Sequence, residues 1–101
     1  LRLADLFKPG ANYLEAISRY SVSDLKKRLG PEGVDDEWIQ NGAGPDAGNY
    51  QGWNISKKGL AITFDPYQVA SYAAGPQRVV IPYSVLKDII KPDGPLAPFN
   101  K

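Results

Sequence analysis

The sequence predicts an α+β domain in which a small antiparallel sheet packs against helices. Two observations support this fold class. Apolar and polar residues alternate through most of residues 50–64, as they do in strands that bury one face. Near both ends of the chain, apolar residues instead recur every three or four positions, which is typical of a helix with one buried side. A length of 101 residues fits one such domain.

The N-terminal part of the chain is predicted to be helical. Residues 3–7 have the apolar spacing of one helical turn, which Lys8-Pro9-Gly10 ends. Residues 11–29 are expected to form either two helices or one kinked helix, ended by Gly30-Pro31. Two pairs of residues in this region have the spacing of a capping box, and they are Asn12 with Glu15 and Ser21 with Asp24.

Residues 30–49 are predicted to form a long loop with one helical turn around residues 35–40, because they are rich in Gly, Pro, Asp and Asn. The glycines of residues 42–48 do not have phosphate-loop spacing, and no strand precedes them. The carboxylates of Asp35-Asp36-Glu37 are consecutive, so they diverge around a helix start and cannot act as the alternating ligands of a calcium loop. The region therefore predicts neither a nucleotide site nor a metal site.

Residues 50–64 predict a β-hairpin with its turn at Ser56-Lys57-Lys58-Gly59. A strand at residues 77–81 is expected to join the same sheet. Large apolar side chains, including Trp53 and Phe64, are expected in the core. The side chains that should face the helices are Trp53, Ile55, Leu60, Ile62 and Phe64.

Two further helical features are predicted after the hairpin. Asp65-Pro66-Tyr67-Gln68 combines a cap, a proline at the first helical position and a capping-box Gln, which predicts a brief helical turn. The chain should reverse at Gly75-Pro76, and Pro82 should open a C-terminal helix that Pro92 stops. The domain is therefore expected to span residues 1–91, with a flexible tail at residues 92–101.

The composition excludes several classes of function. The chain has no Cys and no His, which removes thiolate nucleophiles, thiolate metal sites and every His-dependent catalytic triad. A net charge of +1 does not favour nucleic acid, and the basic run Lys26-Lys27-Arg28 follows Asp24 at helical spacing, as on a solvated helix face. No stretch of the chain approaches the 18 apolar residues of a membrane span.

Catalysis would have to rely on carboxylates, such as Asp65 with Glu15 or Asp46 acting as a glycosidase pair. Nothing in the sequence indicates that any two of them converge, and Asp65 already has a role as a helix cap. We therefore expect no enzymatic activity, no catalytic residue, no metal and no cofactor.

One long string points to a family. Residues 59–76, GLAITFDPYQVASYAAGP, lead into residues 80–86, VIPYSVL, and upstream stand residues 3–10, LADLFKPG, followed by Tyr13-Leu14. The chain resembles the extracytoplasmic domain of lysozyme-responsive anti-sigma factors of the RsiV type, a domain shared with some peptidoglycan deacetylases. In that family, β-strands precede the first helix, so the resemblance implies that this domain lacks its N-terminal strands.

The resemblance implies an α+β domain that is periplasmic, secreted or membrane-anchored in a bacterium. Its expected role is to bind a lysozyme-like protein or a peptidoglycan fragment without catalysis. The alternative is an accessory domain that orients a peptidoglycan or polysaccharide deacetylase. We expect a monomer. Ser71 stands where the family often has proline, which leaves the backbone before Tyr72 less restricted.

The segment from Asp65 to Pro76 is the predicted recognition surface, because tyrosines on a loop held by a rigid scaffold provide both apolar area and a hydroxyl. The alternative is that Tyr67 and Tyr72 pack over the open end of the sheet, with their hydroxyls bonded to the backbone. Tyr83 completes the candidate set, although its place after Pro82 favours the core. The predicted binding residues are Pro66, Tyr67, Tyr72, Gly75 and Tyr83.

Overall fold

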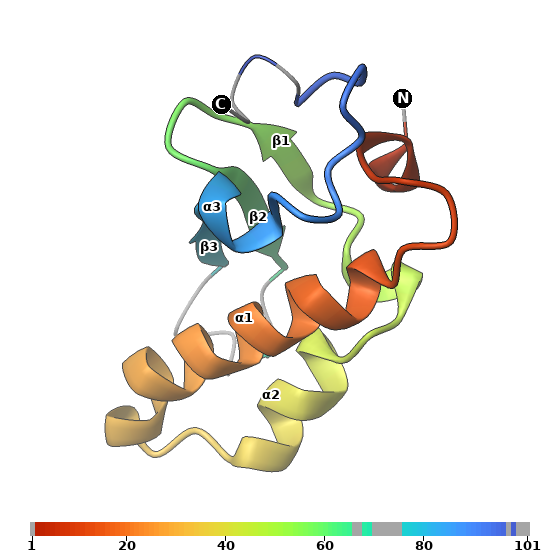
Figure 1. Cartoon of the computed structure of the whole chain (residues 1–101). Coiled ribbons are helices and arrows are strands. Elements are labelled where there is room, and N and C mark those ends of the chain that lie inside the picture. The colour runs from red at the N-terminus through yellow and green to blue at the C-terminus, as the bar shows by residue number, and fades with distance from the viewer. Residues whose placement is uncertain (1, 66–67, 70–75, 97, 99–101) are drawn as a thin grey trace.

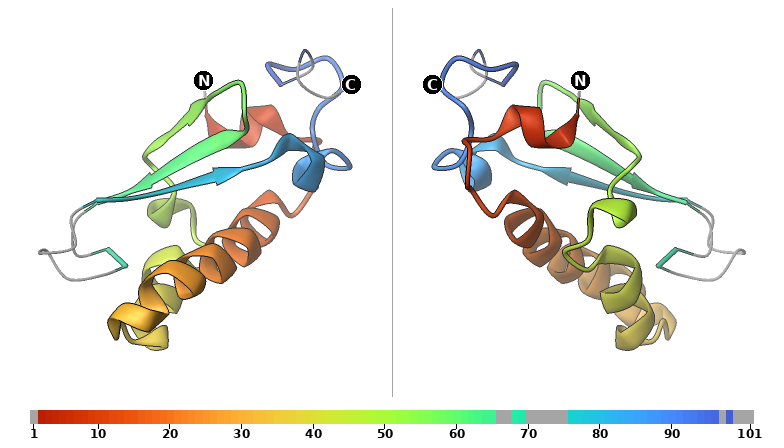
Figure 2. Two further views of the ribbon diagram at one scale, coloured as in Figure 1. Left: turned by 90° about the vertical axis from the view of Figure 1, so that its left-hand side faces the viewer. Right: turned by 90° about the vertical axis from the view of Figure 1, so that its right-hand side faces the viewer.

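Two helices form a layer against one side of a three-stranded antiparallel sheet (Figures 1 and 2). The computed structural model describes residues 2–65, 68–69, 76–96 and 98. The predicted α+β fold class is confirmed. The elements in chain order are the 3₁₀ turn η1 (Leu3–Leu6), α1 (Tyr13–Leu29), η2 (Gly30–Glu32), α2 (Asp36–Ala43), η3 (Ala47–Asn49), β1 (Trp53–Ile55), β2 (Leu60–Phe64), β3 (Gln77–Ile81) and α3 (Tyr83–Leu86).

The N-terminal helical region is one helix of 17 residues, α1, which contacts both α2 and the sheet. Asn12 caps it as predicted, because its Oδ1 accepts the Glu15 N–H at 3.4 Å. The second predicted cap is wrong. Ser21 lies in the middle of α1 with its side chain fully buried on the face that carries Ile17 and Leu25. A small side chain on the core face of a helix does not interrupt it.

The predicted hairpin is confirmed, and its register places Trp53 opposite Ile62 and Ile55 opposite Leu60. The Ser56 N–H donates to the Gly59 carbonyl at 3.1 Å, which closes the turn. A Cβ at Gly59 would lie 2.2 Å from the Ile81 carbonyl oxygen, so only glycine allows the neighbouring strand to approach this closely. The central strand β2 pairs with both β1 and β3, and β3 occupies the predicted residues 77–81.

The two ends of the chain pair with each other, and this shortens the C-terminal helix relative to the prediction. Helix α3 ends at Leu86, and Ile90 forms an antiparallel bridge with Phe7. The Lys8 N–H donates to the Ile89 carbonyl at 2.8 Å, and the Lys91 N–H donates to the Leu6 carbonyl at 3.1 Å. These tertiary hydrogen bonds use backbone groups that a longer helix would have used within itself.

The core extends beyond the predicted end of the domain. Leu96, in the segment assigned to a flexible tail, is fully buried among the core residues. The boundary at residue 91 stays a prediction, but the chain contributes to the core after it. Phe64 is fully buried, as predicted, whereas Trp53 is only partly buried and packs at the edge of the core.

Candidate binding site

Four of the five predicted binding residues, Pro66, Tyr67, Tyr72 and Gly75, lie outside the described residues, so their roles stay predictions. The fifth, Tyr83, is described and is 7% exposed. Its hydroxyl donates to the Ser56 carbonyl in the hairpin turn, and burial raises the pKa of Tyr83. This burial fits the predicted place of Tyr83 in the core and leaves little of its side chain for contact with a ligand.

The described residues at the start of the 65–76 segment are fixed to α2. The Gln68 amide nitrogen donates to the Gly42 and Asn49 carbonyls, both at 2.8 Å, and its oxygen accepts the Asp65 N–H at 3.1 Å, as a capping-box Gln should. Val69 is fully buried. A Cβ at Gly42 would lie 1.8 Å from the Gln68 carbonyl oxygen. Glycine at position 42 is therefore what lets this segment contact α2.

A second surface is a cleft of about 470 Å³ between η1, the first turn of α1 and the segment that leads into β1. We call it the aromatic cleft. Its polar groups come mainly from Arg2 and Gln51, and three aromatic rings contribute to its walls. The residues that line it are Arg2, Leu3, Ala4, Tyr13, Leu14, Ala47, Tyr50, Gln51 and Trp53.

The rings of the aromatic cleft are held by packing beneath them. Tyr13 stacks on Phe7 with ring centroids 5.1 Å apart and planes 8° apart. Tyr50 contacts Phe64 edge to face at 5.6 Å, and its hydroxyl donates to the Ala43 carbonyl at 2.5 Å. Trp53 is fixed by the pairing of β1 with β2. The rings need little reorganisation to receive a ligand, which lowers the entropic cost of binding.

Tyr50 belongs mainly to the floor of the cleft, since it is only 2% exposed, whereas Tyr13 and Trp53 are both partly exposed. Burial raises the pKa of Tyr50 above its ordinary value of 10.0, and the hydroxyls of Ser18 and Ser21 offset part of this increase. The Tyr50 hydroxyl therefore stays protonated and keeps donating to the Ala43 carbonyl over the physiological range. The two rings that remain for ligand contact are those of Tyr13 and Trp53.

The sequence alone does not reveal this cleft, because its residues come from three separate stretches of the chain, 2–4, 13–14 and 47–53. The prediction that Trp53 belongs to the core is wrong in part, since this residue is only partly buried against the core and also lines the cleft. One available signal is the polar Gln51, two positions before Trp53, since the predicted alternation would place both on one face and a polar residue is unusual on a fully buried face.

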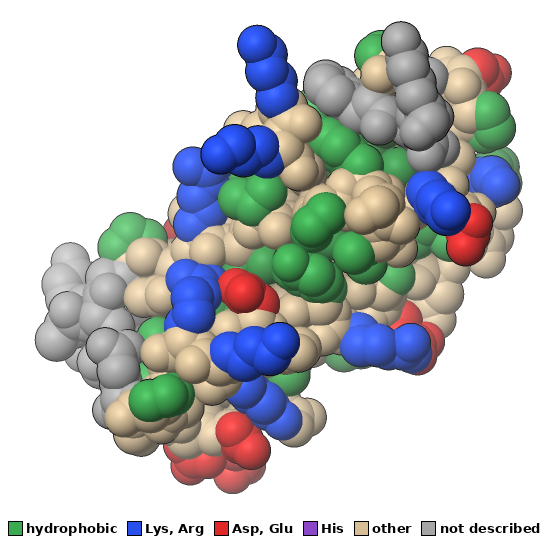
Figure 3. All heavy atoms as spheres, turned by 60° about the vertical axis from the view of Figure 1, so that its left-hand side comes forward, with side chains coloured by type: hydrophobic (Ala, Val, Ile, Leu, Met, Phe, Trp, Pro, Cys, Tyr) green, Lys and Arg blue, Asp and Glu red, His purple; other side chains and the backbone are tan. Residues whose placement is uncertain are grey.

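Charges do not form a site of their own in the described part of the chain. Figure 3 shows Lys and Arg side chains spread over one face, with Asp and Glu among them. Within the predicted basic run, Arg28 pairs with Asp24 at 2.9 Å and Lys26 lies 3.7 Å from Asp36. Among the residues described, no three His, Cys, Asp or Glu side chains are grouped so that they could hold a metal ion. No described helix has the length and apolar content needed to cross a bilayer.

Comparisons with known proteins agree on one family. Residues 4–84 match the family described as "Protein of unknown function (DUF3298)". The chain is 35% identical over 91 residues to the peptidoglycan-N-acetylmuramic acid deacetylase PdaC of Bacillus subtilis strain 168, which covers 90% of this chain and 19% of the deacetylase. It also resembles the crystal structure of a DUF3298 member from Bacteroides fragilis NCTC 9343, with a TM-score of 0.61 at 21% identity, over 100% of this chain and 39% of that one.

These findings confirm the predicted link to peptidoglycan deacetylases, whereas the likeness to lysozyme-responsive anti-sigma factors stays a prediction. The chain spans about a fifth of the deacetylase, so it corresponds to one part of that enzyme. The structural likeness at 21% identity concerns the fold. Because the family match extends over most of the sequence, this protein belongs to the DUF3298 family.

Proposed function

We propose that this chain is a non-catalytic binding domain of the bacterial cell envelope, and that the aromatic cleft holds a glycan segment of the cell wall. The observation that carries this proposal is the cleft itself, where the partly exposed rings of Tyr13 and Trp53 stand beside the polar side chains of Arg2 and Gln51. Its volume of about 470 Å³ lies within the range of small-ligand pockets.

The chemistry of the cleft suits a saccharide better than a purely apolar ligand. The C–H faces of a sugar ring are apolar and pack on aromatic rings, while its hydroxyl and acetamido groups require hydrogen-bond partners. The guanidinium of Arg2 offers donors only, and the Gln51 amide offers both donors and an acceptor. A ring that lies on Trp53 or Tyr13 would place its polar groups within the same cleft as these two side chains.

The deacetylase relative supports a cell-wall ligand and an extracytoplasmic location. Its name describes an enzyme that acts on N-acetylmuramic acid in peptidoglycan, and this chain matches a 91-residue part of it. A domain that binds the glycan beside such an enzyme would raise the effective concentration of substrate at the catalytic domain. The accessory role expected from the sequence and the binding role are then two aspects of the same function.

A second candidate is recognition of a protein, such as a lysozyme-like enzyme, by the segment 65–76. The observation in its favour is the attachment of Gln68 and Val69 to α2. Such an attachment holds residues 68–69 on the scaffold before a partner binds, which reduces the entropy that they lose on binding. The two functions use different surfaces, so one variant in each surface separates them.

The test of the glycan proposal uses the two tryptophans, Trp38 and Trp53. Trp38→Phe leaves Trp53 as the only indole, and its fluorescence should change during a titration with N-acetylated chito-oligosaccharides or with purified glycan strands. Trp53→Ala should weaken binding about tenfold or more, because a central aromatic contact commonly contributes 1.4 kcal/mol or more.

Trp38→Ala is the matched control, since Trp38 lies on α2 and does not line the aromatic cleft. It should retain the affinity of the wild type. Both variants are checked by thermal melting, so that lost binding is not confused with unfolding. Equal affinity of Trp53→Ala and the wild type for every glycan that binds would overturn the assignment of the cleft.

A further inference from the structure

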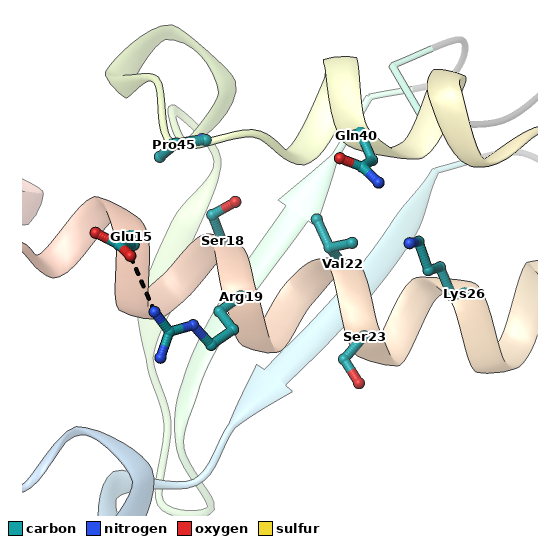
Figure 4. A pocket seen from close by; sticks show the side chains of 8 residues that line it. All are labelled: Glu15, Ser18, Arg19, Val22, Ser23, Lys26, Gln40 and Pro45. Atoms are coloured by element: carbon teal, nitrogen blue, oxygen red, sulfur yellow. Dashed lines mark hydrogen bonds and ion pairs between the residues drawn. The ribbon is translucent and has the colours of Figure 1, made fainter.

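A second pocket of about 470 Å³ lies between α1 and α2, and we call it the helix groove (Figure 4). We propose that the helix groove binds a short peptide with free carboxylates, so that a glycan that carries such a peptide occupies cleft and groove together. This inference rests on the proposed function of the aromatic cleft. The residues that line the groove are Glu15, Ser18, Arg19, Val22, Ser23, Lys26, Gln40 and Pro45.

The groove has an apolar middle and polar margins. Figure 4 shows Val22 of α1 and Gln40 of α2 facing each other across it, with Pro45 near the end where Glu15 lies. Arg19 and Lys26 stand along the α1 margin. They are seven residues apart, which is about 10.5 Å along a helix. An extended peptide covers that distance with about three residues at 3.3 Å each.

The groove has more free donors than acceptors. Arg19 gives one nitrogen to Glu15 at 2.9 Å, so the remaining guanidinium N–H groups are available. Lys26 has one ion pair, to Asp36 at 3.7 Å, which leaves other donors of its ammonium. The side chains of Ser23 and Gln40 make no hydrogen bond to other residues in the described part of the chain. Carboxylates and backbone carbonyls are the groups that satisfy such donors.

Hydrogen bonds at the end of α2 hold the walls of the groove in place. The Ser18 hydroxyl donates to the Ala43 carbonyl at 2.7 Å, which ties the middle of α1 to the last turn of α2. The Asn49 amide donates to the Asn41 and Gly44 carbonyls, both at 3.2 Å, which ties the C-terminal end of α2 to η3. The groove therefore keeps its width without a ligand, as a preorganised site should.

Cleft and groove are neighbours along the same edge of the molecule. Leu14 lines the cleft and the next residue, Glu15, lines the groove. On the opposite wall, Ala47 lines the cleft and Pro45 lines the groove. The two sites are therefore close in sequence on both walls, since Glu15 follows Leu14 and only Asp46 separates Pro45 from Ala47. A ligand with a glycan part and a peptide part can cross from one site to the other without a long linker.

The experiment compares three ligands by calorimetry on the whole chain: a glycan oligosaccharide, the same oligosaccharide with its peptide, and that conjugate with its carboxylates amidated. In the wild type, the peptide should improve affinity about tenfold, since a second linked contact gains from effective concentration. Amidation should remove most of this gain. The variant Arg19→Gln/Lys26→Gln should lose the gain and keep its affinity for the bare glycan.

Lys27→Gln is the control, because Lys27 is an exposed base on the same helix outside the groove. It should keep the full gain from the peptide. If the conjugate and the bare glycan bind the wild type equally, the groove proposal is wrong while the proposed function stands. If the bare glycan does not bind at all, the proposed function fails and this inference fails with it. A gain that survives in Arg19→Gln/Lys26→Gln also overturns the inference.

Discussion

The aromatic cleft and the 65–76 segment differ in how they are encoded. The segment is one continuous stretch in which proline, tyrosine and glycine stand close together, so its potential for binding can be seen in the sequence. The cleft draws on three stretches, and none of them has an unusual composition by itself. A binding surface on a single loop can therefore be proposed from sequence, whereas a cleft between elements becomes visible only once the packing is known.

The largest effects are expected from Tyr67→Ala and Tyr72→Ala, the two tyrosines of the predicted recognition segment. If they anchor a protein partner, each substitution should cost about 2 kcal/mol or more of binding free energy and leave the melting temperature nearly unchanged. The measurement pairs a thermal melt with the affinity for lysozyme. Affinity for glycans should not change, because the described residues that line the aromatic cleft come from the stretches 2–4, 13–14 and 47–53.

The alternative for these tyrosines predicts the reverse pattern. If they are core residues, each truncation should cost about 3–5 kcal/mol of folding free energy, and any loss of binding would follow from unfolding. Early melting in both variants would therefore refute the assignment of the 65–76 segment as a recognition surface.

Gly42→Ala should detach the 65–76 segment from α2 without reaching the cleft. The new methyl group would lie 1.8 Å from the Gln68 carbonyl oxygen and 2.8 Å from a Val69 methyl group, so the backbone must move. Overpacking of this kind costs about 1–3 kcal/mol of folding free energy. Chemical denaturation measures this loss, and glycan titration should show an unchanged cleft.

Gly30→Ala is the control for that substitution. Gly30 has helical backbone angles, and no heavy atom lies within 4 Å of a Cβ placed there. Its stability should fall only slightly, because the ring of Pro31 disfavours helical angles at a preceding alanine and no other contact is affected. A Gly42→Ala variant as stable as Gly30→Ala would show that the contact between residue 68 and α2 is not needed for folding.

The smallest effect concerns Tyr50, which links the floor of the cleft to α2. Tyr50→Phe should cost about 1 kcal/mol of folding free energy at neutral pH, because the Ala43 carbonyl loses one of its two donors. Ser18 continues to donate to that carbonyl, which limits the loss. Urea denaturation of the two proteins measures the difference.

The raised pKa of Tyr50 also predicts how the free energy of unfolding changes with pH. Burial raises the pKa of Tyr50 in the folded state above 10.0, whereas the unfolded chain titrates near 10.0. The folded state therefore holds a proton that the unfolded state releases, and stability falls as the pH rises above about 10. Denaturation curves measured between pH 8 and 11 should show a shallower decline for Tyr50→Phe. An identical decline would contradict this role for Tyr50.

Local patterns predicted the sheet well, since the alternation in residues 50–64 and the glycine turn at Gly59 depend on neighbours in sequence. Helix lengths were less predictable. Ser21 has the spacing of a cap, yet tertiary packing keeps it inside α1. Ile90 has helical spacing, yet its backbone neighbours pair with residues 6–8. Both errors come from contacts between distant parts of the chain, which outweigh local preference.

In the candidate site, too, contacts between residues close in sequence could be predicted and contacts between distant residues could not. The hydrogen bond from the Asp65 N–H to the Gln68 side-chain oxygen was visible in the sequence because the two residues are three positions apart. The contact of Gln68 with Gly42 was not, because 26 positions separate them. The cleft residues from Arg2 to Trp53 are farther apart still. The exposed part of Trp53 depends on where η1 lies, and no local pattern determines that position.

The pairing of residues 6–8 with residues 89–91 has a mechanical consequence. Residues 6 and 91 lie at the same end of this short ladder, where the two chain ends leave it. Tension applied through both ends would load its hydrogen bonds one after another, which is unzipping rather than shear. The same tension would pull Leu3 and Ala4 away from the cleft that they line. A ligand in the cleft should then resist extension, and stretching should weaken ligand binding by the same free energy.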